Sequence, residues 1–293
     1  AARQLAAGDF GYSQSDRWSA LGTDGLVEPG NADCSSSTGM ALLLARLAHE
    51  ALGNDAMAIT IESAVVPRTE ALMARELATA IGIQHRVLTA AELDLPHFST
   101  NPPDRCYHCR KVRDSLARDW ATRHGFNTIA DGLNYSDLSD YRPGLRAATE
   151  DDIWHPFIEF KFTKDDIRSL AKELGLPGWD RPSMACLASR FPHSFAVTQE
   201  RVERVDRAEE YLRASGFNKA RVRHFPHDLA LVEVDDPQRA IAMRHEIAQR
   251  LGEYGFAFIA LDLEDFASGK MNRTAGEGRD NARLTDEKRL ADS

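Results

Sequence analysis

Residues 41–61, ALLLARLAHEALGNDAMAITI, hold the two hydrophobic periods that decide the fold. Residues 41–52 present an apolar helical face that stops at a glycine, and residues 56–61 (AMAITI) form the continuous apolar run of a buried strand. The alternation continues, with helices expected at 67–81, 107–124 and 163–174 and strands at 84–88 and 127–131. Thr163 and Asp166 have the spacing of a capping box. We therefore predict an α/β fold, a doubly wound parallel sheet with helices on both faces.

The pattern changes after residues 175–182 (GLPGWDRP), whose glycines and prolines break any helix. Beyond them a helix, a hairpin turning at Pro226–Asp228, a second helix and a strand predict a smaller α+β domain. Ahead of the first helix, residues 1–40 supply no apolar strand, although a doubly wound sheet needs one. We expect an irregular, poorly packed segment at 1–40, an α/β domain at 41–178, an α+β domain at 179–267 and a polar, disordered tail at 268–293.

The charge balance limits the partners of the chain. With 36 basic and 45 acidic residues it carries a formal net charge of −9, which disfavours extended binding to nucleic acid. A small anionic substrate held by a few arginines fits this balance better. The sequence has neither a long uncharged apolar stretch nor the pattern of a secretory signal, so we expect no membrane contact and a cytoplasmic location.

The cysteines are the first candidates for chemistry. Without an export signal we expect Cys34, Cys106, Cys109 and Cys186 to be reduced thiols. The C-x-x-C pair Cys106–Cys109 can ligate a metal or a cluster iron, form a disulfide, or be purely structural. Cys186 lies four residues before Arg190, and a nearby cation favours the reactive thiolate form. The alternative for Cys186 is a buried cysteine in an apolar segment.

Two further patterns suggest ligand binding. Arg221 and Arg223 alternate along a predicted strand, so both guanidinium groups leave the same face and can clamp a phosphate or carboxylate. The alternative is a solvated strand face. Glu233, on the paired strand, can partner one of the two arginines. Residues 130–137 (ADGLNYSD) follow a buried strand, where a nucleotide would lie, although an ordinary turn uses the same residue types.

Taken in order, several segments resemble the LarE family of sulfur-insertion enzymes, which belongs to the PP-loop ATP pyrophosphatase superfamily. The resemblance runs from Ala41 to Asn272 and is strongest where the ACLASRFP block follows a C-x-x-C. The segments that carry it are PPDRCYHCRK (102–111), IADGLNYSDLSDYRPG (129–144), LAKELGLPGWDRPSMACLASRFP (170–192), KARVRHF (219–225) and, weakly, SGKMN (268–272).

The resemblance implies a reaction. Enzymes of this kind use ATP and Mg²⁺ to adenylate a carboxylate of pyridinium-3,5-biscarboxylate mononucleotide, and sulfur then replaces AMP. The thiocarboxylate leads to the nickel-pincer cofactor. In one branch a single cysteine at the position of Cys186 gives up its own sulfur. In another, three cysteines hold a [4Fe–4S] cluster that carries an extra sulfide, and Cys106, Cys109 and Cys186 match that branch.

Further site residues are implied by the same resemblance, with Cys186 as the catalytic residue. The substrate phosphate would be bound by Ser189, Arg190, Arg221, Arg223 and Glu233. The ATP site would include Ser35, Ser36, Ser37, Thr60, Asp131, Gly132 and Asn134. A homo-oligomer is also expected.

The phosphate-binding loop departs from the family pattern. The family has S-G-G-V-D-S where this chain has Ser-Ser-Ser-Thr-Gly-Met at residues 35–40. The two glycines become Ser36 and Ser37, and the aspartate and second serine become Gly39 and Met40. Either ATP binding has been lost, or residues 8–41 are misread, for example through a frame error.

Three alternative functions remain open. The first is a catalytically impaired homologue that binds the substrate but not ATP. The second is a tRNA thiolase of the same superfamily, against which the net charge of −9 argues. The third is a small metal-binding module without chemistry, which the pair of Arg221 and Arg223 makes less attractive.

Overall fold

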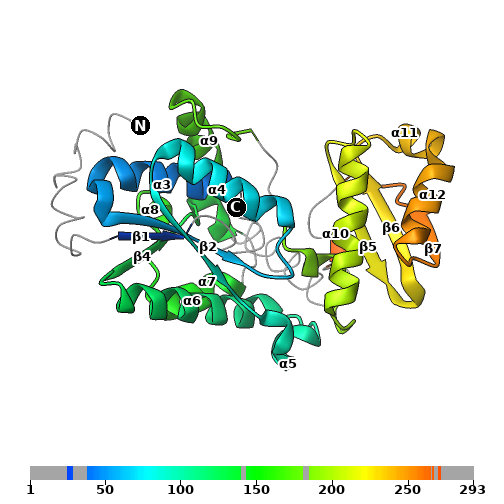
Figure 1. The fold of residues 1–293 in the computed structure, drawn as a ribbon, viewed down its shortest axis with the longest axis horizontal. Coiled ribbons are helices and arrows are strands. Elements are labelled where there is room, and N and C mark those ends of the chain that lie inside the picture. The colour runs from blue at the N-terminus through cyan, green and yellow to red at the C-terminus, as the bar shows by residue number, and fades with distance from the viewer. Residues whose placement is uncertain are drawn as a thin grey trace, which may run out of the picture. The chain divides into compact units, whose positions relative to one another are not determined.

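The structure, a computed structural model, describes residues 25–28, 38–139, 143–180, 185–264, 266 and 270–271. The chain forms two compact units (Figure 1). The first is made of Ala1–Glu92 and Asp104–Cys186, and the second of Leu93–Pro103 and Leu187–Ser293.

The first unit is built on a parallel sheet. Within the described residues this sheet has four strands in the order β3 (Gln84–Thr89), β2 (Ala56–Glu62), β1 (Gly25–Glu28) and β4 (Thr128–Asp131). All three neighbouring pairs are parallel. The predicted α/β class with a parallel sheet is therefore confirmed. The strand order reverses at β1, because the chain continues from β1 to β2 on one side whereas β4 lies on the other.

Strand β1 corrects one expectation. The sequence predicted no strand ahead of residue 41, yet Gly25–Glu28 is a central strand that pairs with both β2 and β4. Four residues are too few for a hydrophobic period to stand out, and the pairing comes from backbone hydrogen bonds to neighbours distant in sequence. Apart from β1, residues 1–37 lie outside the described residues, so the expected poor packing of this segment stays a prediction.

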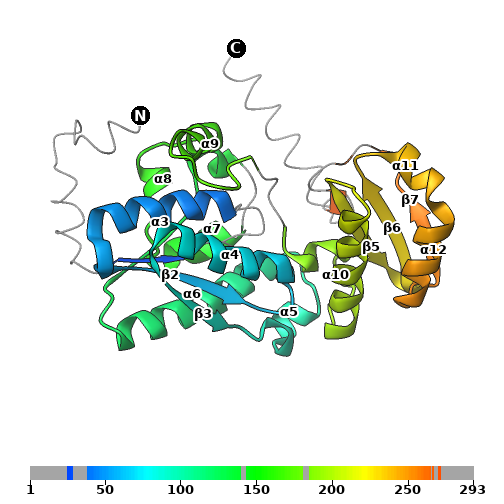
Figure 2. The ribbon, with the colours of Figure 1, turned by 45° about the horizontal axis from the view of Figure 1, so that its top comes forward.

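Helices cover both faces of this sheet (Figures 1 and 2). The alternation of side chains along β2 decides which residues face which layer: Ala56 and Ala58 join one apolar cluster, and Ile59 and Ile61 join the other. The first cluster is formed with α3 (Thr38–Leu52), α4 (Arg68–Ile81) and α9 (Lys164–Glu173), and the second with α6 (Arg105–Arg123) and α7 (Pro143–Glu150). The short helix α8 (Pro156–Glu159) precedes α9.

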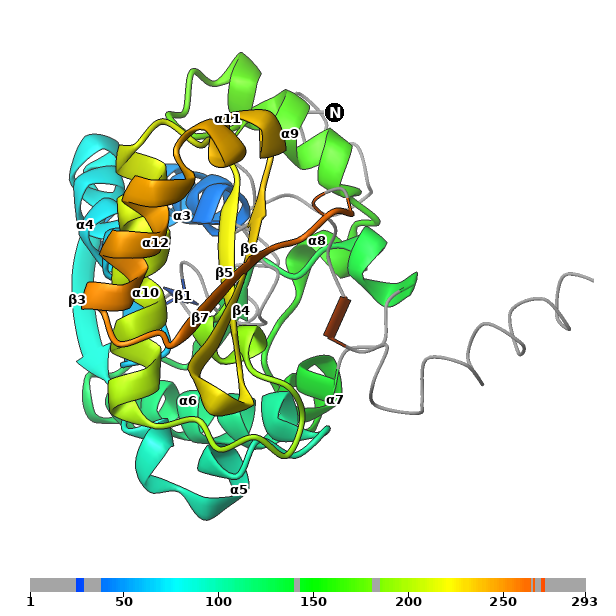
Figure 3. The same ribbon diagram turned by 90° about the vertical axis from the view of Figure 1, so that its right-hand side faces the viewer.

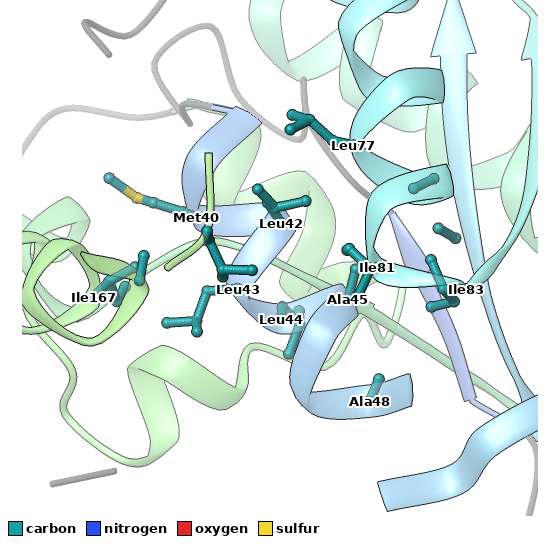
Figure 4. Close-up of a cluster of buried hydrophobic side chains, with 14 of the residues drawn as sticks. Met40, Leu42, Leu43, Leu44, Ala45, Ala48, Leu77, Ile81, Ile83 and Ile167 are labelled. Atoms are coloured by element: carbon teal, nitrogen blue, oxygen red, sulfur yellow. The ribbon is translucent and has the colours of Figure 1, made fainter. Parts of the chain in front are cut away.

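Local signals in the sequence set several helix ends. Gly82 ends α4 with a φ of 85°, a left-handed conformation that glycine adopts at little cost. The capping box at the start of α9 is confirmed: the Thr163 side chain accepts from the backbone of Asp166, whose carboxylate accepts from the backbone of Thr163. Figure 4 shows the cluster between α3, α4 and α9, including Leu43, Leu44 and Ile167.

The second unit holds a mixed sheet (Figure 3). In its described part the strand order is β5 (Ala220–Phe225), β6 (Leu229–Val234) and β7 (Phe258–Leu261), with an antiparallel first pair and a parallel second pair. The predicted hairpin is confirmed, and its turn holds His227 and Asp228 at positive φ. Its helices are α5 (Pro96–Ser99), α10 (Gln199–Ala214), α11 (Pro237–Ala242) and α12 (Arg244–Glu253).

Three polar contacts hold outlying segments in the second unit. The segment Leu93–Pro103 joins it because Val197 N donates to Ser99 O at 2.8 Å and the Asn101 side chain donates to Pro192 O at 2.6 Å. Lys270 lies within the tail expected to be disordered, yet it is buried because it pairs with Asp262 at 2.6 Å. Among the described helices none is long and apolar enough to cross a membrane.

The layered packing predicts the cost of a core truncation. Leu43 is 0% exposed in the cluster beneath α3, so Leu43→Ala should lower the free energy of unfolding by about 2–5 kcal/mol. Leu72 on α4 is 60% exposed, and Leu72→Ala should change it by less than about 0.5 kcal/mol. Urea denaturation followed by circular dichroism compares the two variants, and equal effects would contradict the packing described.

Candidate functional site

Three thiols gather in the first unit. Cys106 and Cys109 lie in the first turn of α6, where a separation of three residues puts side chains on one face. Burial raises the pKa of the Cys109 thiol well above its ordinary value, and charges on Cys186 and Cys106 raise it further, whereas Arg113 lowers it. Cys186 is therefore close enough to the pair to act on it electrostatically, despite the long sequence between them. Cys34 lies outside the described residues.

Buried charges surround these thiols. Arg105 lies 3.9 Å from the Cys106 sulfur through Nη2. Arg113 donates to Glu92 Oε1 at 2.9 Å and to a β2 carbonyl, and the Cys109 sulfur lies 3.8 Å from the same Glu92 oxygen. Both arginines are less than a tenth exposed. Sequence reasoning missed them, although their placement one residue before and four residues after cysteines of the C-x-x-C was a usable signal.

The donor set can be compared with what a metal group requires. Among the described residues no three His, Cys, Asp or Glu side chains are grouped so as to hold a single metal ion. A [4Fe–4S] cluster is larger, and its ligating sulfurs stay roughly 6–7 Å apart because each binds a different iron. Soft thiolates suit such a cluster, and the nearby guanidinium groups of Arg105 and Arg113 suit its negative charge. The chemistry of the three cysteines and the two arginines therefore fits a [4Fe–4S] cluster.

Asp131 forms a buried polar centre at the carboxyl end of β4. The carboxylate is 0% exposed and accepts from Arg110 at 2.8 Å, from His155 Nδ1 at 2.8 Å and from the Leu133 backbone at 3.0 Å. Burial opposes ionisation, but the Arg110 guanidinium and the His155 hydrogen bond hold the pKa of Asp131 below its ordinary value. Arg110 also binds Asp114 at 2.7 Å.

The loop after Asp131 touches the start of α3. A Cβ on Gly132 would lie 3.0 Å from Ala41 N, which is tighter than most Cβ contacts, so the close approach favours glycine. Asn134 donates to the Met40 sulfur at 3.0 Å and to Asp137 at 2.7 Å. Three of the predicted nucleotide-site residues, Asp131, Gly132 and Asn134, thus lie at the end of β4 and in the loop that packs against α3.

Of the other predicted nucleotide-site residues, Thr60 is the one within the described residues. Thr60, on β2, shares a hydrogen bond of 2.9 Å with His85 Nε2. Ser35, Ser36 and Ser37 lie outside the described residues.

The second unit contains a buried cluster of arginines. Arg190 binds Glu209 at 2.6 Å and the Ser189 hydroxyl at 2.9 Å. Arg223 forms a two-point ion pair with Glu233 across the β5–β6 hairpin. The expected pairing of Glu233 with one strand arginine is confirmed, whereas Glu209 on α10 was missed because its partner is distant in sequence.

Arg221 lies in the same cluster and is only 9% exposed. Burial, together with the positive charges of Arg190 and Arg223, lowers its pKa to about 10. Phe266 covers it, with the guanidinium carbon 4.4 Å from the ring centre. The alternative of a solvated strand face is therefore wrong for Arg221 and Arg223. Such a concentration of buried guanidinium groups is suited to an anion.

Comparison with known proteins places these features in a family. The chain is 38% identical over 235 residues to an uncharacterized protein of Synechocystis sp., covering 79% of this chain and 87% of that protein. It is 34% identical over 235 residues to the pyridinium-3,5-bisthiocarboxylic acid mononucleotide synthase of Lactiplantibacillus plantarum, covering 79% and 85%. The chain belongs to the LarE family.

This LarE homologue is also similar, more distantly, to a second characterised protein. It is 29% identical over 137 residues to the tRNA-specific 2-thiouridylase MnmA of Desulforamulus reducens, with 37% of each chain covered. No protein-family model matches the chain. The names of the two characterised relatives agree on sulfur incorporation.

The buried pairing of Arg190 with Glu209 predicts an acid-sensitive contribution to stability. Burial opposes ionisation of Glu209, but Arg190 and Arg213 hold its pKa below the ordinary 4.5. The unfolded chain thus binds this proton more tightly, so the contribution is present above about pH 4.5 and is lost as pH falls through the folded pKa. We expect Glu209→Gln to cost about 3–5 kcal/mol at pH 7.

Urea midpoints measured from pH 7 to pH 3.5 check this expectation. The unaltered chain should lose more stability on acidification than the Glu209→Gln variant. Glu253, which pairs with Arg250 at the surface, is the control: Glu253→Gln should cost less than about 1 kcal/mol at pH 7. Parallel pH curves for the unaltered chain and Glu209→Gln would contradict the assignment.

Proposed function

We propose that this protein uses ATP to transfer sulfur to a carboxylate of pyridinium-3,5-biscarboxylate mononucleotide during biosynthesis of the nickel-pincer cofactor. The observation that carries the proposal is the proximity of Cys186 and Cys106 to Cys109, in a chain 34% identical to the synthase that makes the bisthiocarboxylic acid mononucleotide. The parallel sheet with helices on both faces is consistent with a doubly wound PP-loop fold.

The first chemical step is carboxylate activation. A substrate carboxylate oxygen attacks the α-phosphorus of ATP, and pyrophosphate leaves with Mg²⁺ neutralising its charge. The nucleotide lies at the carboxyl end of the sheet, beside Gly132, Asn134 and the start of α3. Gly132 matters there because a Cβ would press against the backbone of Ala41 and Met40.

The second step is sulfur transfer, with release of AMP. In the branch where cysteine is the sulfur donor, Cys186 is the catalytic residue: its thiolate attacks the activated acyl carbon and AMP leaves, giving a thioester. Loss of the Cys186 α-proton to a base and cleavage of its Cβ–Sγ bond then release the thiocarboxylate and leave dehydroalanine at position 186. In the other branch Cys106, Cys109 and Cys186 hold a [4Fe–4S] cluster, which supplies sulfide when bound. Arg105 and Arg113 stabilise negative charge on the sulfurs in both branches.

The arginine cluster of the second unit binds the substrate phosphate. Arg221 and Arg223 supply donors from one face of β5, and Arg190 with Ser189 supplies donors from the preceding segment. Glu233 and Glu209 hold two of the guanidinium groups in place, so the anion meets a preorganised site.

One observation favours the impaired homologue as a second candidate. Met40 stands where the family has the last serine of its phosphate loop, and it is 2% exposed within the apolar cluster under α3 (Figure 4). Its thioether accepts from Asn134, so that amide is engaged by Met40. A chain with this loop should bind the mononucleotide but bind ATP weakly.

Repair of the loop tests this candidate. Replacing residues 35–40 by S-G-G-V-D-S should raise pyrophosphate release with ATP and the pyridinium substrate by at least about tenfold. Glycine adopts positive φ at little cost, whereas each serine forced into that conformation costs about 1 kcal/mol. The restored aspartate helps to place Mg²⁺. Leu72→Ala, at an exposed position of α4, is the control and should leave the rate unchanged. Equal rates for the unaltered and repaired chains would mean that another loop carries the triphosphate.

Cysteine variants test the sulfur chemistry and separate its two branches. Cys186→Ala should abolish thiocarboxylate formation in both branches, as detected by mass spectrometry of the product. Cys106→Ala and Cys109→Ala should abolish it only if a cluster is needed, with loss of bound iron and of its visible absorbance. Full activity of Cys186→Ala would refute the proposed function. The assay uses the repaired loop if the unaltered chain fails to adenylate.

A further inference from the structure

The strand order of the first unit marks one edge of the sheet as the place for a ligand. In open sheets of parallel strands, ligands bind beyond the carboxyl ends at the point where the order reverses. Here that point lies between β1 and β4, whose final residues Glu28 and Asp131 are paired in register. The chain leaving β4 also approaches α3 closely, since Gly132 lies against Ala41.

His155 is held at this edge by backbone hydrogen bonds. Trp154 N donates to Ile129 O at 2.9 Å, and Asp131 N donates to Trp154 O at 3.1 Å, so the chain runs beside β4 for one step. The next residue, His155, then places its Nδ1 2.8 Å from Asp131 Oδ1. Proline at 156 begins α8 directly afterwards and fixes the backbone direction.

The Asp131 carboxylate determines how the imidazole is protonated. Its low pKa keeps it ionised, so it can only accept, and Nδ1 of His155 must carry the hydrogen. Both oxygens of Asp131 are engaged by neighbouring groups: Oδ2 accepts from Arg110, and Oδ1 accepts from His155 and Leu133. This makes Asp131 a positioning residue.

The opposite ring nitrogen is unsatisfied. His155 Nε2 is buried and has no hydrogen-bond partner in the described part of the chain, although its side chain as a whole is 13% exposed. In an imidazole that carries a single hydrogen, placed on Nδ1, the other nitrogen Nε2 is the acceptor position. A buried acceptor without a donor is costly and rare in native proteins, so a bound group that supplies one is the physical expectation.

We propose that His155 Nε2 accepts a hydrogen bond from the nucleoside half of the bound adenine nucleotide. Asp131 holds the imidazole in the accepting tautomer, and the pair fixes the nucleoside at the point where the strand order reverses. The donor is either a ribose hydroxyl or the 6-amino group of adenine, since both present a hydrogen to an acceptor. This inference rests on the proposed use of an adenine nucleotide, but not on the phosphate loop.

The test measures AMP binding to the unaltered full chain by calorimetry. AMP lacks the β- and γ-phosphates that the phosphate loop would hold, so the departure at residues 35–40 has little effect on it. His155→Asn retains an amide near the Nδ1 position for Asp131 and removes Nε2. We expect it to bind AMP at least about tenfold more weakly. His155→Gln, whose amide oxygen can reach the Nε2 position, should recover part of the affinity.

A matched control comes from the same unit. His124 is exposed, and its Nδ1 bonds to Trp120 O at 2.8 Å, so His124→Asn should leave AMP affinity unchanged. Thermal unfolding of each variant reports whether the fold persists. Should His155→Asn fail to fold, the analogue series on the unaltered chain and the His155→Gln variant carry the test.

Nucleotide analogues identify the donor. The unaltered chain is titrated with 2′-deoxy-AMP, 3′-deoxy-AMP and purine riboside monophosphate, which lacks the 6-amino group. The analogue missing the true donor should bind the unaltered chain about tenfold more weakly and should show no further loss in a folded His155 variant.

Several results would overturn the inference. One is equal binding of AMP and all analogues by the unaltered chain and His155→Asn, which would mean that water satisfies Nε2. Another is an absence of AMP binding by the unaltered chain. Neither result affects the outcome of the sulfur-transfer assay on Cys186, because that assay measures thiocarboxylate formation. Conversely, a His155-dependent AMP site in a chain that forms no thiocarboxylate would uphold this inference and refute the proposed function.

Discussion

The buried polar interactions of the first unit depend on the carboxylate of Asp131, at the carboxyl end of β4. It is bound by a guanidinium from α6, an imidazole from the segment after α7 and a backbone amide of its own loop. Removing a charge from water is costly, and only several simultaneous donors can offset that cost. One carboxylate therefore fixes how α6, the β4 loop and the segment before α8 meet.

The same residue links structure to the neighbouring thiols. Arg110, which binds Asp131, directly follows Cys109 in α6, so the helix that carries the C-x-x-C is held to β4 by that ion pair. Arg113, one turn further along, connects the helix to β2 through Ile61 O and to Glu92. Cys106 and Cys109 thus lie on a helix anchored to two strands, and such anchoring preserves the geometry that a reactive sulfur requires.

The second unit also buries charged groups, but there the central charges are positive. Buried guanidinium groups at 190, 221 and 223 repel one another, and the carboxylates of Glu209 and Glu233 relieve part of that repulsion. Arg221 bears the remainder, as its lowered pKa indicates. Apolar residues often pack in such a place at lower cost, so the cluster is weak evidence of stabilisation. The anionic ligand proposed above would offset the remaining repulsion.

Much of the architecture followed from local patterns. The apolar face of α3, the buried run of β2, the glycine after α4 and the Thr163–Asp166 capping box are each encoded within a few residues, because helix and strand periods and caps are local properties. The alternation of Arg221 and Arg223 likewise predicted a shared face, and both side chains are buried in one cluster on β5.

Tertiary structure decided the rest. Strand β1 escaped prediction because four residues show no period and its stability comes from β2 and β4 on either side. Glu92, Glu209 and His155 carry no signal of their own, since a charged or aromatic polar residue is ordinary on a surface. Their roles arise only when folding brings Arg113, Arg190 and Asp131 beside them and excludes water. The sequence by itself determined the segments and their chemistry, whereas burial and long-range pairing decided which charges act together.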